Sequence, residues 1–366
     1  MLKRNQLKIA SLTGIACLIL ASCSRKDDVQ PLNTQSTTET TTTPETSDEV
    51  KTLDVSSTAK ITVSGSTLQL GVVGHPMGDA PYVQTPATTQ IKLIKGMGMT
   101  WYRVGFQTKS DGTISVPWLF EPLQQAAQAG GVKLLPMLYT RTLDLSASQS
   151  ASYKAGKTLG ANFAAKYGKY FTYYDLGNDL ELKLLLPNTT GTSQTHYDRA
   201  KFNVVAAYLK GMDEGIKSKD SDAKTMVSAG WLHYGFIRML DWYGVKFDVV
   251  AYHWYSEMEA IAPNKPYYIP DITKKLASLF PDKPIWFTEI GLRYKKVSTH
   301  EADQNAFISK FVAKCKANPQ VKVVMVYELF NEPDKSQLEA NYGILKWTNP
   351  YTVFAKKMSA NNLTIN

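Results

Sequence analysis

Cysteine is almost absent from this chain, which has three in 366 residues. Cys17 and Cys23 lie near the N-terminus, so Cys315 stands alone in the rest of the sequence. A lone cysteine forms no internal disulfide, and Cys315 has neither cysteine nor histidine neighbours at metal-ligand spacing. Because apolar side chains repeat on one helical face of residues 307–315, we expect Cys315 to lie in the core.

Signals for metals, nucleotides and nucleic acids are also lacking. The five histidines are too scattered for a recognisable zinc motif, and no glycine-rich phosphate loop follows the first predicted strand. The formal charge is +9, but lysine and arginine are interleaved with acids and form no arginine-rich arm. We therefore expect no metal, no cofactor and no nucleic-acid partner, and we expect a monomer.

No run of residues after position 22 is long and apolar enough to cross a membrane. The first residues have a different pattern, because Lys3, Arg4 and Lys8 precede or enter an uncharged apolar stretch at 9–20. That stretch is too short for a permanent span, and we interpret residues 1–22 as a signal peptide. Its removal would leave a charge nearer +6.

Leu-Ala-Ser-Cys at 20–23 resembles a bacterial lipobox, in which Cys23 becomes the lipidated first residue of the mature protein. An ordinary cleaved signal with an incidental cysteine is the alternative. The charged segment 24–28 is similar to the tag that Bacteroidetes-type lipoproteins carry toward the cell surface. This resemblance implies a cell-envelope protein that is lipid-anchored to the outer membrane and surface-exposed.

Two regions follow the signal peptide. Residues 23–58 are rich in Thr, Ser, Glu and Asp and contain too little apolar material to offset the entropy of ordering, so we expect a flexible tether. Residues 59–366 contain no second linker of this kind. Their length is normal for one α/β barrel.

From residue 68 onward, short apolar runs alternate with amphipathic stretches. The short runs are continuously apolar, as in parallel strands buried on both faces. Eight strands in strict alternation with helices favour the α/β class and a closed (β/α)8 TIM barrel. The expected strands are 68–73, 100–106, 132–139, 171–176, 225–229, 247–253, 284–289 and 321–329, and the clearest helices are 118–130, 150–167, 196–217 and 300–318.

Polar and aromatic residues gather where these strands end. Chemistry in such barrels lies at this end, because the following loops converge on the axis. Aromatic rings stack on pyranose faces and polar groups bind hydroxyls, so the set favours a sugar site. In strand order the candidates are His75; Arg103; Tyr139 and Arg141; Asn178, Asp179 and Glu181; Trp231 and His233; His253, Trp254 and Tyr255; Glu289; and Glu328, Asn331 and Glu332.

Four of these segments resemble the clan of retaining barrel glycosidases, clan A of the glycoside hydrolases. Tyr-Asp-Leu-Gly-Asn-Asp at 174–179 and Pro-Ile-Trp-Phe-Thr-Glu-Ile-Gly at 284–291 resemble the segments with an Asn-Glu pair after strand four and a second Glu after strand seven. Asp-Val-Val-Ala-Tyr-His-Trp-Tyr at 248–255 is similar to the clan's strand-six segment, and Arg103 matches its strand-two arginine. The resemblance covers about residues 65–355 and is nearest to family 39 and the glycosyl hydrolase catalytic core group.

The resemblance implies an enzyme that cleaves a β-linked poly- or oligosaccharide with retention of configuration. Glu289 would be the nucleophile, and Arg103, His253 and Tyr255 would orient it and keep it ionised. Asn178 would bind the sugar 2-hydroxyl. The further expected substrate contacts are Trp231, Glu181, Glu332 and His75.

One position departs from the clan, whose acid/base is glutamate, because Asp179 stands there with a side chain one methylene shorter. Three interpretations are open: Asp179 is the acid/base, Glu181 supplies the proton instead, or no competent acid remains. The third motivates an alternative function, a non-catalytic glycan-binding lipoprotein with a degenerate cleft. Asn-Glu-Pro at 331–333 is often seen at the acid/base, but it follows strand eight, so we expect it to contact substrate or to form a solvent-facing turn.

Overall fold

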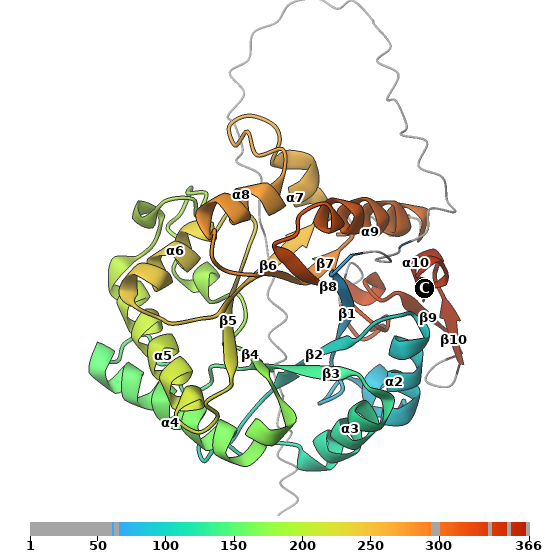
Figure 1. The fold of residues 1–366 in the computed structure, drawn as a ribbon, viewed down its shortest axis with the longest axis horizontal. Coiled ribbons are helices and arrows are strands. Elements are labelled where there is room, and N and C mark those ends of the chain that lie inside the picture. Colours follow the sequence, from blue (N-terminus) through green and yellow to red (C-terminus); the bar gives the residue numbers. More distant parts are fainter. Residues whose placement is uncertain (1–60, 62–65, 294–300, 336–338, 350–352, 364–366) are drawn as a thin grey trace, which may run out of the picture. The chain divides into compact units, whose positions relative to one another are not determined.

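The computed structural model describes residue 61 and residues 66–293, 301–335, 339–349 and 353–363. Eight parallel strands close into a barrel in chain order, and helices surround it (Figure 1). This is the (β/α)8 TIM barrel, so the predicted fold class is confirmed. The predicted signal peptide, Cys23 and the tether to residue 58 lie outside the described residues.

Each predicted strand overlaps one barrel strand. The strands are β1 (Gln69–Gly74), β2 (Trp101–Phe106), β3 (Lys133–Leu138), β4 (Tyr173–Asp175), β5 (Lys224–Gly230), β6 (Val249–Tyr255), β7 (Ile285–Gly291) and β8 (Val321–Val326). A separate antiparallel pair follows, β9 (Leu345–Asn349) with β10 (Val353–Lys356). Two predicted ends were wrong in a way that bears on function, since β6 and β7 each run two residues further than expected.

The helices are mostly those that connect consecutive strands. They are α1 (Ala80–Val83), α2 (Ala87–Gly96), α3 (Pro117–Gly130), α4 (Gln149–Tyr167), α5 (Arg199–Lys217), α6 (Tyr234–Tyr243), α7 (Ser256–Ile261), α8 (Ile272–Leu279), α9 (Glu301–Lys316) and α10 (Met358–Asn362). The side chains of Ser148 and Asp198 accept hydrogen bonds from first-turn amides and so start α4 and α5. Gly131 and Gly244 adopt left-handed backbone after α3 and α6, where glycine meets little steric cost.

Two apolar cores hold the barrel together. The larger one lies between the strands and the helical shell, and it contains Cys315, whose predicted burial is confirmed. The smaller one fills the interior of the barrel below the site, where Trp101, Tyr173 and Trp286 form a cluster of contacting rings. Because these three rings fill the axis, the interior of the barrel is packed.

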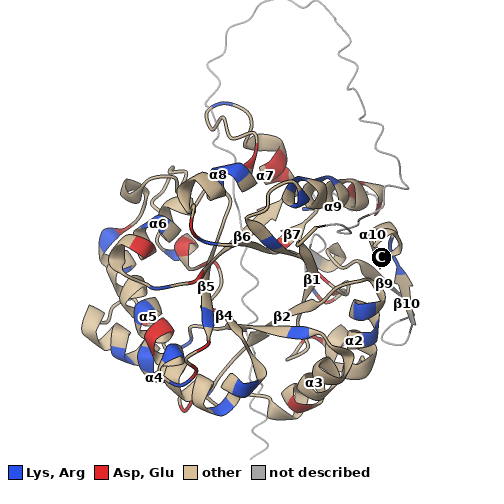
Figure 2. Cartoon of the chain, viewed as in Figure 1, with Lys and Arg blue, Asp and Glu red and all other residues tan. Residues whose placement is uncertain are grey.

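The outside of the barrel shows no separation of charge. Lysine and arginine are spread over the helical shell and alternate with acidic residues (Figure 2). This distribution agrees with the interleaving of basic and acidic residues along the sequence. Among the described residues, none of the helices combines the length and the apolar character that a bilayer span needs.

Candidate active site

The site is built on residues that alternate into the barrel above the ring cluster. On β2 the inward residue after Trp101 is Arg103, and on β4 the inward residue after Tyr173 is Asp175. Arg103 and Asp175 are almost completely buried, with 2% and 0% of their surfaces exposed. A charged pair therefore stands directly above the apolar plug and forms the floor of the site.

Arg103 connects three acceptors. Its Nε donates to Asp175 Oδ2 at 2.8 Å, and its Nη1 donates to Glu289 Oε1 at 2.7 Å. Its Nη2 donates to Asn178 Oδ1 at 2.6 Å. The planar guanidinium suits this task, because its five donors lie in a fixed fork.

A β-bulge aims Glu289 into the barrel. Strict alternation from the inward Trp286 would turn Glu289 outward, toward the helices. Instead Tyr252 pairs with Phe287 and His253 pairs with Glu289, so Thr288 is an extra residue on β7. The register with β8 shifts over the same segment. The bulge reverses the alternation and points Glu289 inward, next to the inward residues of β6.

Glu289 has charged or hydroxyl partners on both carboxylate oxygens. Oε1 accepts from Arg103, and Oε2 accepts from the Tyr255 hydroxyl at 2.8 Å. His253 Nε2 lies 3.6 Å from Oε1. The Glu289 side chain is 9% exposed, so only a small part of it reaches solvent.

Asp179 faces the same histidine from the other side. Its Oδ1 lies 2.9 Å from His253 Nδ1, and its Oδ2 accepts from Asn178 Nδ2 at 2.7 Å. A ring of contacts thus runs through Glu289, Arg103, Asn178, Asp179 and His253, and we call these five residues the carboxylate ring. Within this ring, the Asp179 side chain is 23% exposed, which is more than that of Glu289.

The backbone is strained beside this ring. Asp179 has φ 46° and Trp231 has φ 48°, both in the left-handed region that side chains with a Cβ seldom adopt. Trp231 stacks on Trp254 and meets Tyr267 edge-on, so its ring is fixed at the end of β5. Outliers of this kind persist where the surroundings over-determine them, and they cluster at functional sites.

The charges around His253 keep a proton on its ring, which lies between Glu289 and Asp179. Burial is the largest influence on the His253 pKa and would lower it, but the Glu289 and Asp179 charges outweigh burial and raise it to about 9. Burial also acts to raise the Asp179 pKa, yet His253 and Arg103 hold that pKa below its ordinary value. At neutral pH the imidazolium of His253 therefore stands between two carboxylates.

A second polar group, the rim cluster, lies between the ends of β1 and β8. It comprises His75, Asp79, Glu328, Glu332 and Lys335. His75 Nδ1 lies 2.6 Å from Glu332, 3.0 Å from Glu328 and 3.4 Å from Asp79. Lys335 pairs with both Glu332 and Asp79. The cluster therefore holds three carboxylates around two cationic groups.

Aromatic rings connect the rim cluster to the carboxylate ring. The Tyr327 ring contacts His75 and Tyr255 at centroid distances of 5.8 and 6.3 Å. Tyr255 in turn bonds Glu289. The two polar groups therefore belong to one face of the barrel end.

The two glutamates of the rim cluster have different pKa values, because they lie close together among other charged groups. Burial and the charge of Glu332 raise the pKa of Glu328 to about 7. Burial acts in the same direction on Glu332, but His75 and Lys335 lower its pKa to about 2. His75 has a pKa well above its ordinary value, because the neighbouring carboxylates outweigh burial.

The rim cluster also contains the group of described residues whose ligand atoms are close enough to hold a metal ion. Ligand atoms of His75, Glu328 and Glu332 lie within 4.8 Å of one another. However, Lys335 pairs with Glu332, and His75 faces both glutamates. Cationic groups of the chain itself thus occupy the place where an ion would be bound.

Several predicted site residues take a different position from the expected one. Glu181 was predicted to contact substrate, but it is 0% exposed and faces the Gly230 amide and His233, so this prediction was wrong. Arg103 lies inside β2 and not at its end. Trp254 turns outward and donates to Glu259. Glu332 is 2% exposed, which excludes the solvent-facing turn.

Most of the other predicted residues lie in or beside the carboxylate ring or the rim cluster. Asn178, Asp179, His253, Tyr255 and Glu289 are brought together, and His75 and Glu332 meet in the rim cluster. Arg141 bonds Gln107 at the outer edge. Sequence reasoning missed Asp175, Asp79 and Lys335. Only Asp175 carried a signal, an acid within an otherwise apolar strand.

Comparison with known proteins agrees with this architecture. Residues 222–357 match the family model described as glycosyl hydrolase catalytic core. No curated protein matches the sequence significantly. The match includes His253, Glu289 and the second half of the barrel, whereas Arg103 and Asp179 lie before it.

Solved structures, among them two β-glycosidases, share the fold. The β-glycosidase BGL167 is similar over 82% of this chain and 96% of its own, with a TM-score of 0.58 and 15% identity. A family 1 β-glucosidase from Thermotoga maritima is similar over 83% and 98%, with a TM-score of 0.56 and 12% identity. The virulence factor SghA from Agrobacterium tumefaciens is similar over 81% and 95%, with a TM-score of 0.59 and 12% identity. At these identities the likeness concerns the barrel itself.

Proposed function

We propose that this protein is a glycoside hydrolase that cleaves a β-linked poly- or oligosaccharide with retention, with Glu289 as nucleophile and Asp179 as acid/base. The observation that carries the proposal is that these two carboxylates face opposite nitrogens of one imidazole, 2.9 and 3.6 Å away. Carboxylates that flank a glycosidic bond lie roughly 5 to 5.5 Å apart in retaining enzymes and 6.5 to 9.5 Å apart in inverting ones. One imidazole therefore separates the two carboxylates, and trapping of a glycosyl adduct on Glu289 would distinguish retention from inversion.

In the first step, Glu289 attacks the anomeric carbon while Asp179 gives a proton to the departing glycosidic oxygen. This breaks the glycosidic bond and forms a covalent ester between the sugar and Glu289. In the second step, Asp179 takes a proton from water, and the water oxygen attacks the same carbon. The ester breaks and leaves Glu289 as a carboxylate, and the proton on Asp179 passes back to His253, from which it came.

The neighbours of Glu289 support its role as nucleophile. Arg103 and the Tyr255 hydroxyl both donate to its carboxylate, one to each oxygen, and so fix the direction in which the carboxylate points. Asn178 already bonds Arg103 and Asp179, and its remaining amide hydrogen is proposed to donate to the sugar 2-hydroxyl. Trp231, His75 and Glu332 are proposed to contact the bound sugar.

The proton for the leaving group is proposed to come from the His253–Asp179 pair. Asp179 alone is a poor acid at neutral pH, because its pKa is lowered. His253 carries the proton beside it, with a pKa raised to about 9. Transfer along the 2.9 Å contact between His253 and Asp179 would load the acid when the substrate excludes water from the site.

One observation favours a second function, a surface protein that binds glycans without cleaving them. Asp179 is shorter than the glutamate of the clan, and both of its oxygens are engaged by His253 and Asn178. If it cannot leave these partners, no acid assists the leaving group. Such a protein would keep the cleft and bind sugar, but it would not turn it over.

Aryl glycosides distinguish these functions, because good leaving groups need little acid assistance. A panel of dinitrophenyl and nitrophenyl β-glycosides and purified polysaccharides would be tested for both hydrolysis and binding. Glu289→Ala should abolish cleavage of every substrate. Asp179→Ala should preserve the first step on dinitrophenyl glycosides and slow polysaccharide cleavage by about 10²- to 10⁴-fold.

Glu181→Gln is the matched control, since Glu181 follows Asp179 on the same loop but is fully buried. It should leave the ratio of rates on aryl and natural substrates unchanged. Sugar binding by the wild type without hydrolysis of any substrate would establish the binding function. Cleavage that survives in Glu289→Ala would refute the assigned nucleophile.

The cellular location is a separate part of the proposal. We propose that Cys23 carries the acyl chains that attach the protein to the outer membrane and that residues 24–58 separate the barrel from the bilayer. Metabolic labelling with an alkynyl fatty acid tests this directly. Labelled wild type and unlabelled Cys23→Ala are expected, and equal labelling of both would contradict the anchor.

A further inference from the structure

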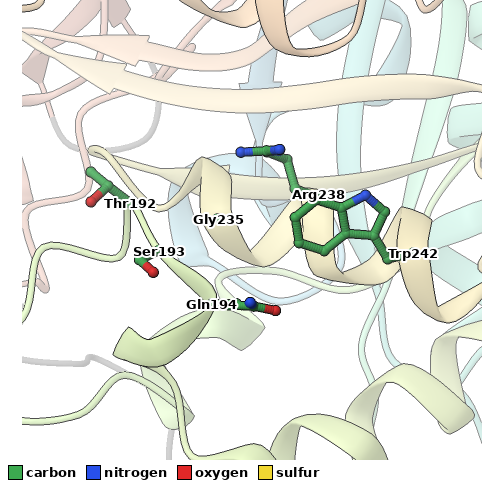
Figure 3. A pocket seen from close by; sticks show the side chains of 6 residues that line it. All are labelled: Thr192, Ser193, Gln194, Gly235, Arg238 and Trp242. Atoms are coloured by element: carbon green, nitrogen blue, oxygen red, sulfur yellow. The ribbon is translucent and has the colours of Figure 1, made fainter.

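A small pocket lies on the wall of the barrel, along α6 and outside the candidate active site. It has a volume of about 260 Å³ and is lined by Thr192, Ser193, Gln194, Gly235, Arg238 and Trp242. Figure 3 shows Arg238 and Trp242 projecting from α6 and the three polar side chains on the segment that faces them. We call it the α6 pocket.

Arg238 is held in place by Trp242. The guanidinium carbon of Arg238 lies 4.7 Å from the centre of the Trp242 ring, a cation–π contact. Within the described parts of the chain, no carboxylate pairs with Arg238. A guanidinium stacked on a ring keeps its N–H donors in the plane, where they are available to a bidentate anion such as a carboxylate.

Trp242 is exposed far more than a structural tryptophan. Its exposed fraction is 61%, while most of the large aromatic side chains of the chain are buried. An indole of this kind provides a flat apolar platform beside polar groups. In the same pocket the Gln194 side chain is exposed, and the hydroxyls of Thr192 and Ser193 bond only within their own segment.

The polar segment is fixed against α6. Gly235 donates its amide to Gly191 O at 3.2 Å, and a Cβ on Gly235 would lie 2.5 Å from that same oxygen. Tyr197 adds hydrogen bonds to the carbonyls of Gly191 and His233. The two walls of the α6 pocket therefore keep a constant separation.

The pocket begins at the same end of the barrel as the carboxylate ring. His233 immediately precedes α6 and contacts Glu181, which lies two residues after Asp179. From Gly235 to Trp242 the helix runs about 10 Å down the wall, at 1.5 Å per residue. An extended oligosaccharide bound at the carboxylate ring would therefore have α6 as a neighbouring surface.

We propose that the α6 pocket binds a hexuronate unit of an anionic polysaccharide. The pyranose ring would stack on the Trp242 indole, its carboxylate would pair with Arg238, and Gln194 would bond a hydroxyl. The cationic group without a carboxylate partner selects an acidic sugar over a neutral one, since a carboxylate supplies two acceptors to the guanidinium fork. This site is independent of the proposed catalytic residues, although its glycan would be that of the proposed function.

Calorimetric titration of the full chain tests the proposal. The probes are β-linked uronate chains, namely the mannuronate blocks of alginate and hyaluronate fragments, with cellohexaose and laminarihexaose as neutral controls. The wild type should bind at least one uronate probe, and Trp242→Ala and Arg238→Met should each weaken that binding at least tenfold. Arg238→Lys should recover only part of it, because an ammonium cannot form the bidentate pair.

Trp118→Ala is the matched control, because Trp118 is 66% exposed on α3, on the opposite side of the barrel (Figure 1). It should leave binding unchanged. Thermal unfolding would show that each variant is folded. Failure of every uronate probe, equal affinity for a neutral hexasaccharide, or undiminished binding in Trp242→Ala and Arg238→Met would each overturn the proposal.

Activity on aryl glycosides keeps this test separate from that of the proposed function. Trp242→Ala should hydrolyse small aryl glycosides at the wild-type rate, and Glu289→Gln should retain uronate binding at the α6 pocket. If the wild type cleaves nothing but still binds uronate through Trp242, the hydrolase proposal fails and the α6 pocket stands.

Discussion

Arg103 is the residue on which the floor of the site depends. It is buried between Asp175 and Glu289, and it bonds both of them. Removing one partner of a buried ion pair leaves an uncompensated charge, which typically costs about 3 to 5 kcal/mol. Arg103→Met should therefore lower the free energy of unfolding by roughly that amount, measured by urea denaturation.

A surface lysine provides the control for this substitution. Lys166 pairs with Asp111, and both side chains are largely exposed. Exposed pairs contribute little because solvent screens them. Lys166→Met should leave the urea midpoint almost unchanged, and an equal loss in both variants would contradict the special role assigned to Arg103.

His253 should make stability depend on pH. Its pKa is raised from 6.5 to about 9 in the folded protein, so the folded state binds its proton more tightly than the unfolded state. The resulting stability is fully present below pH 6.5 and is lost as the pH rises through about 9. In urea unfolding, the wild type should therefore lose more stability than His253→Asn between these values.

The same experiment separates the contribution of His253 to stability from that of the other histidine with a raised pKa. His75 also has a raised pKa and remains in both proteins, so its contribution cancels in the comparison. Parallel stability curves for wild type and His253→Asn across this window would show that His253 does not carry the proton in the folded state.

At the residue scale, sequence reasoning located side chains that lie together where they belong to a recognisable segment. Glu289, His253 and Tyr255 are brought together at the predicted strand ends. It missed Lys335 and Asp79, although each lies three or four residues from a predicted site residue, because only the fold brings the two together across more than 200 residues. The prediction for Glu181 was wrong for a related reason, because a short helical turn after Asp179 directs its side chain toward β5.

At the element scale, the closest packing joins α4 and α5 through glycines on both helices. A Cβ on Gly156 would lie 2.0 Å from Tyr208 O, and one on Gly211 would lie 2.1 Å from Tyr153 O. The backbones therefore approach closely enough that no methyl group fits. Gly211→Ala should lower the free energy of unfolding by about 1 to 3 kcal/mol or more, as overpacking does.

Gly96 offers the matched substitution. It lies at the end of α2, and a Cβ there would have no neighbour within 4 Å. Gly96→Ala should leave the thermal midpoint unchanged or slightly raise it, since alanine is the better helix residue. A similar effect of alanine at both positions would mean that the helices can separate without cost.

The bulge on β7 is a second element with a measurable consequence. Thr288 is the extra residue, and among the described residues its hydroxyl has no hydrogen-bond partner although it is buried. An unsatisfied buried hydroxyl costs stability, so Thr288→Val should raise the free energy of unfolding by about 1 kcal/mol. Thr225→Val should do the reverse, because Thr225 Oγ1 donates to buried Asp213 at 2.6 Å.

Both changes would be measured by urea denaturation. Destabilisation by Thr288→Val as large as that by Thr225→Val would show that the Thr288 hydroxyl has a hydrogen-bond partner.

The bulge also explains which feature of β7 the sequence could not predict. The apolar run identifies the strand, but alternation alone would have placed Glu289 on the wrong face, and only pairing with β6 and β8 corrects it.

At the scale of the whole molecule, the order of eight apolar runs was enough to predict the closed barrel. Parallel strands buried on both faces give an unbroken apolar signal, which is why all eight were located. The α6 pocket could not be predicted in this way, since Gln194 and Trp242 belong to different connections and meet only when β4 and β5 lie side by side.

The central claim is that Glu289 becomes covalently bonded to sugar during turnover. Incubation with activated 2-deoxy-2-fluoro β-glycosides, followed by mass spectrometry of peptides, tests it most directly. We predict one sugar adduct per molecule, on Glu289, with loss of activity that recovers slowly in water. An adduct on Asp179 or Glu328, or steady hydrolysis of the probe without any adduct, would contradict the account.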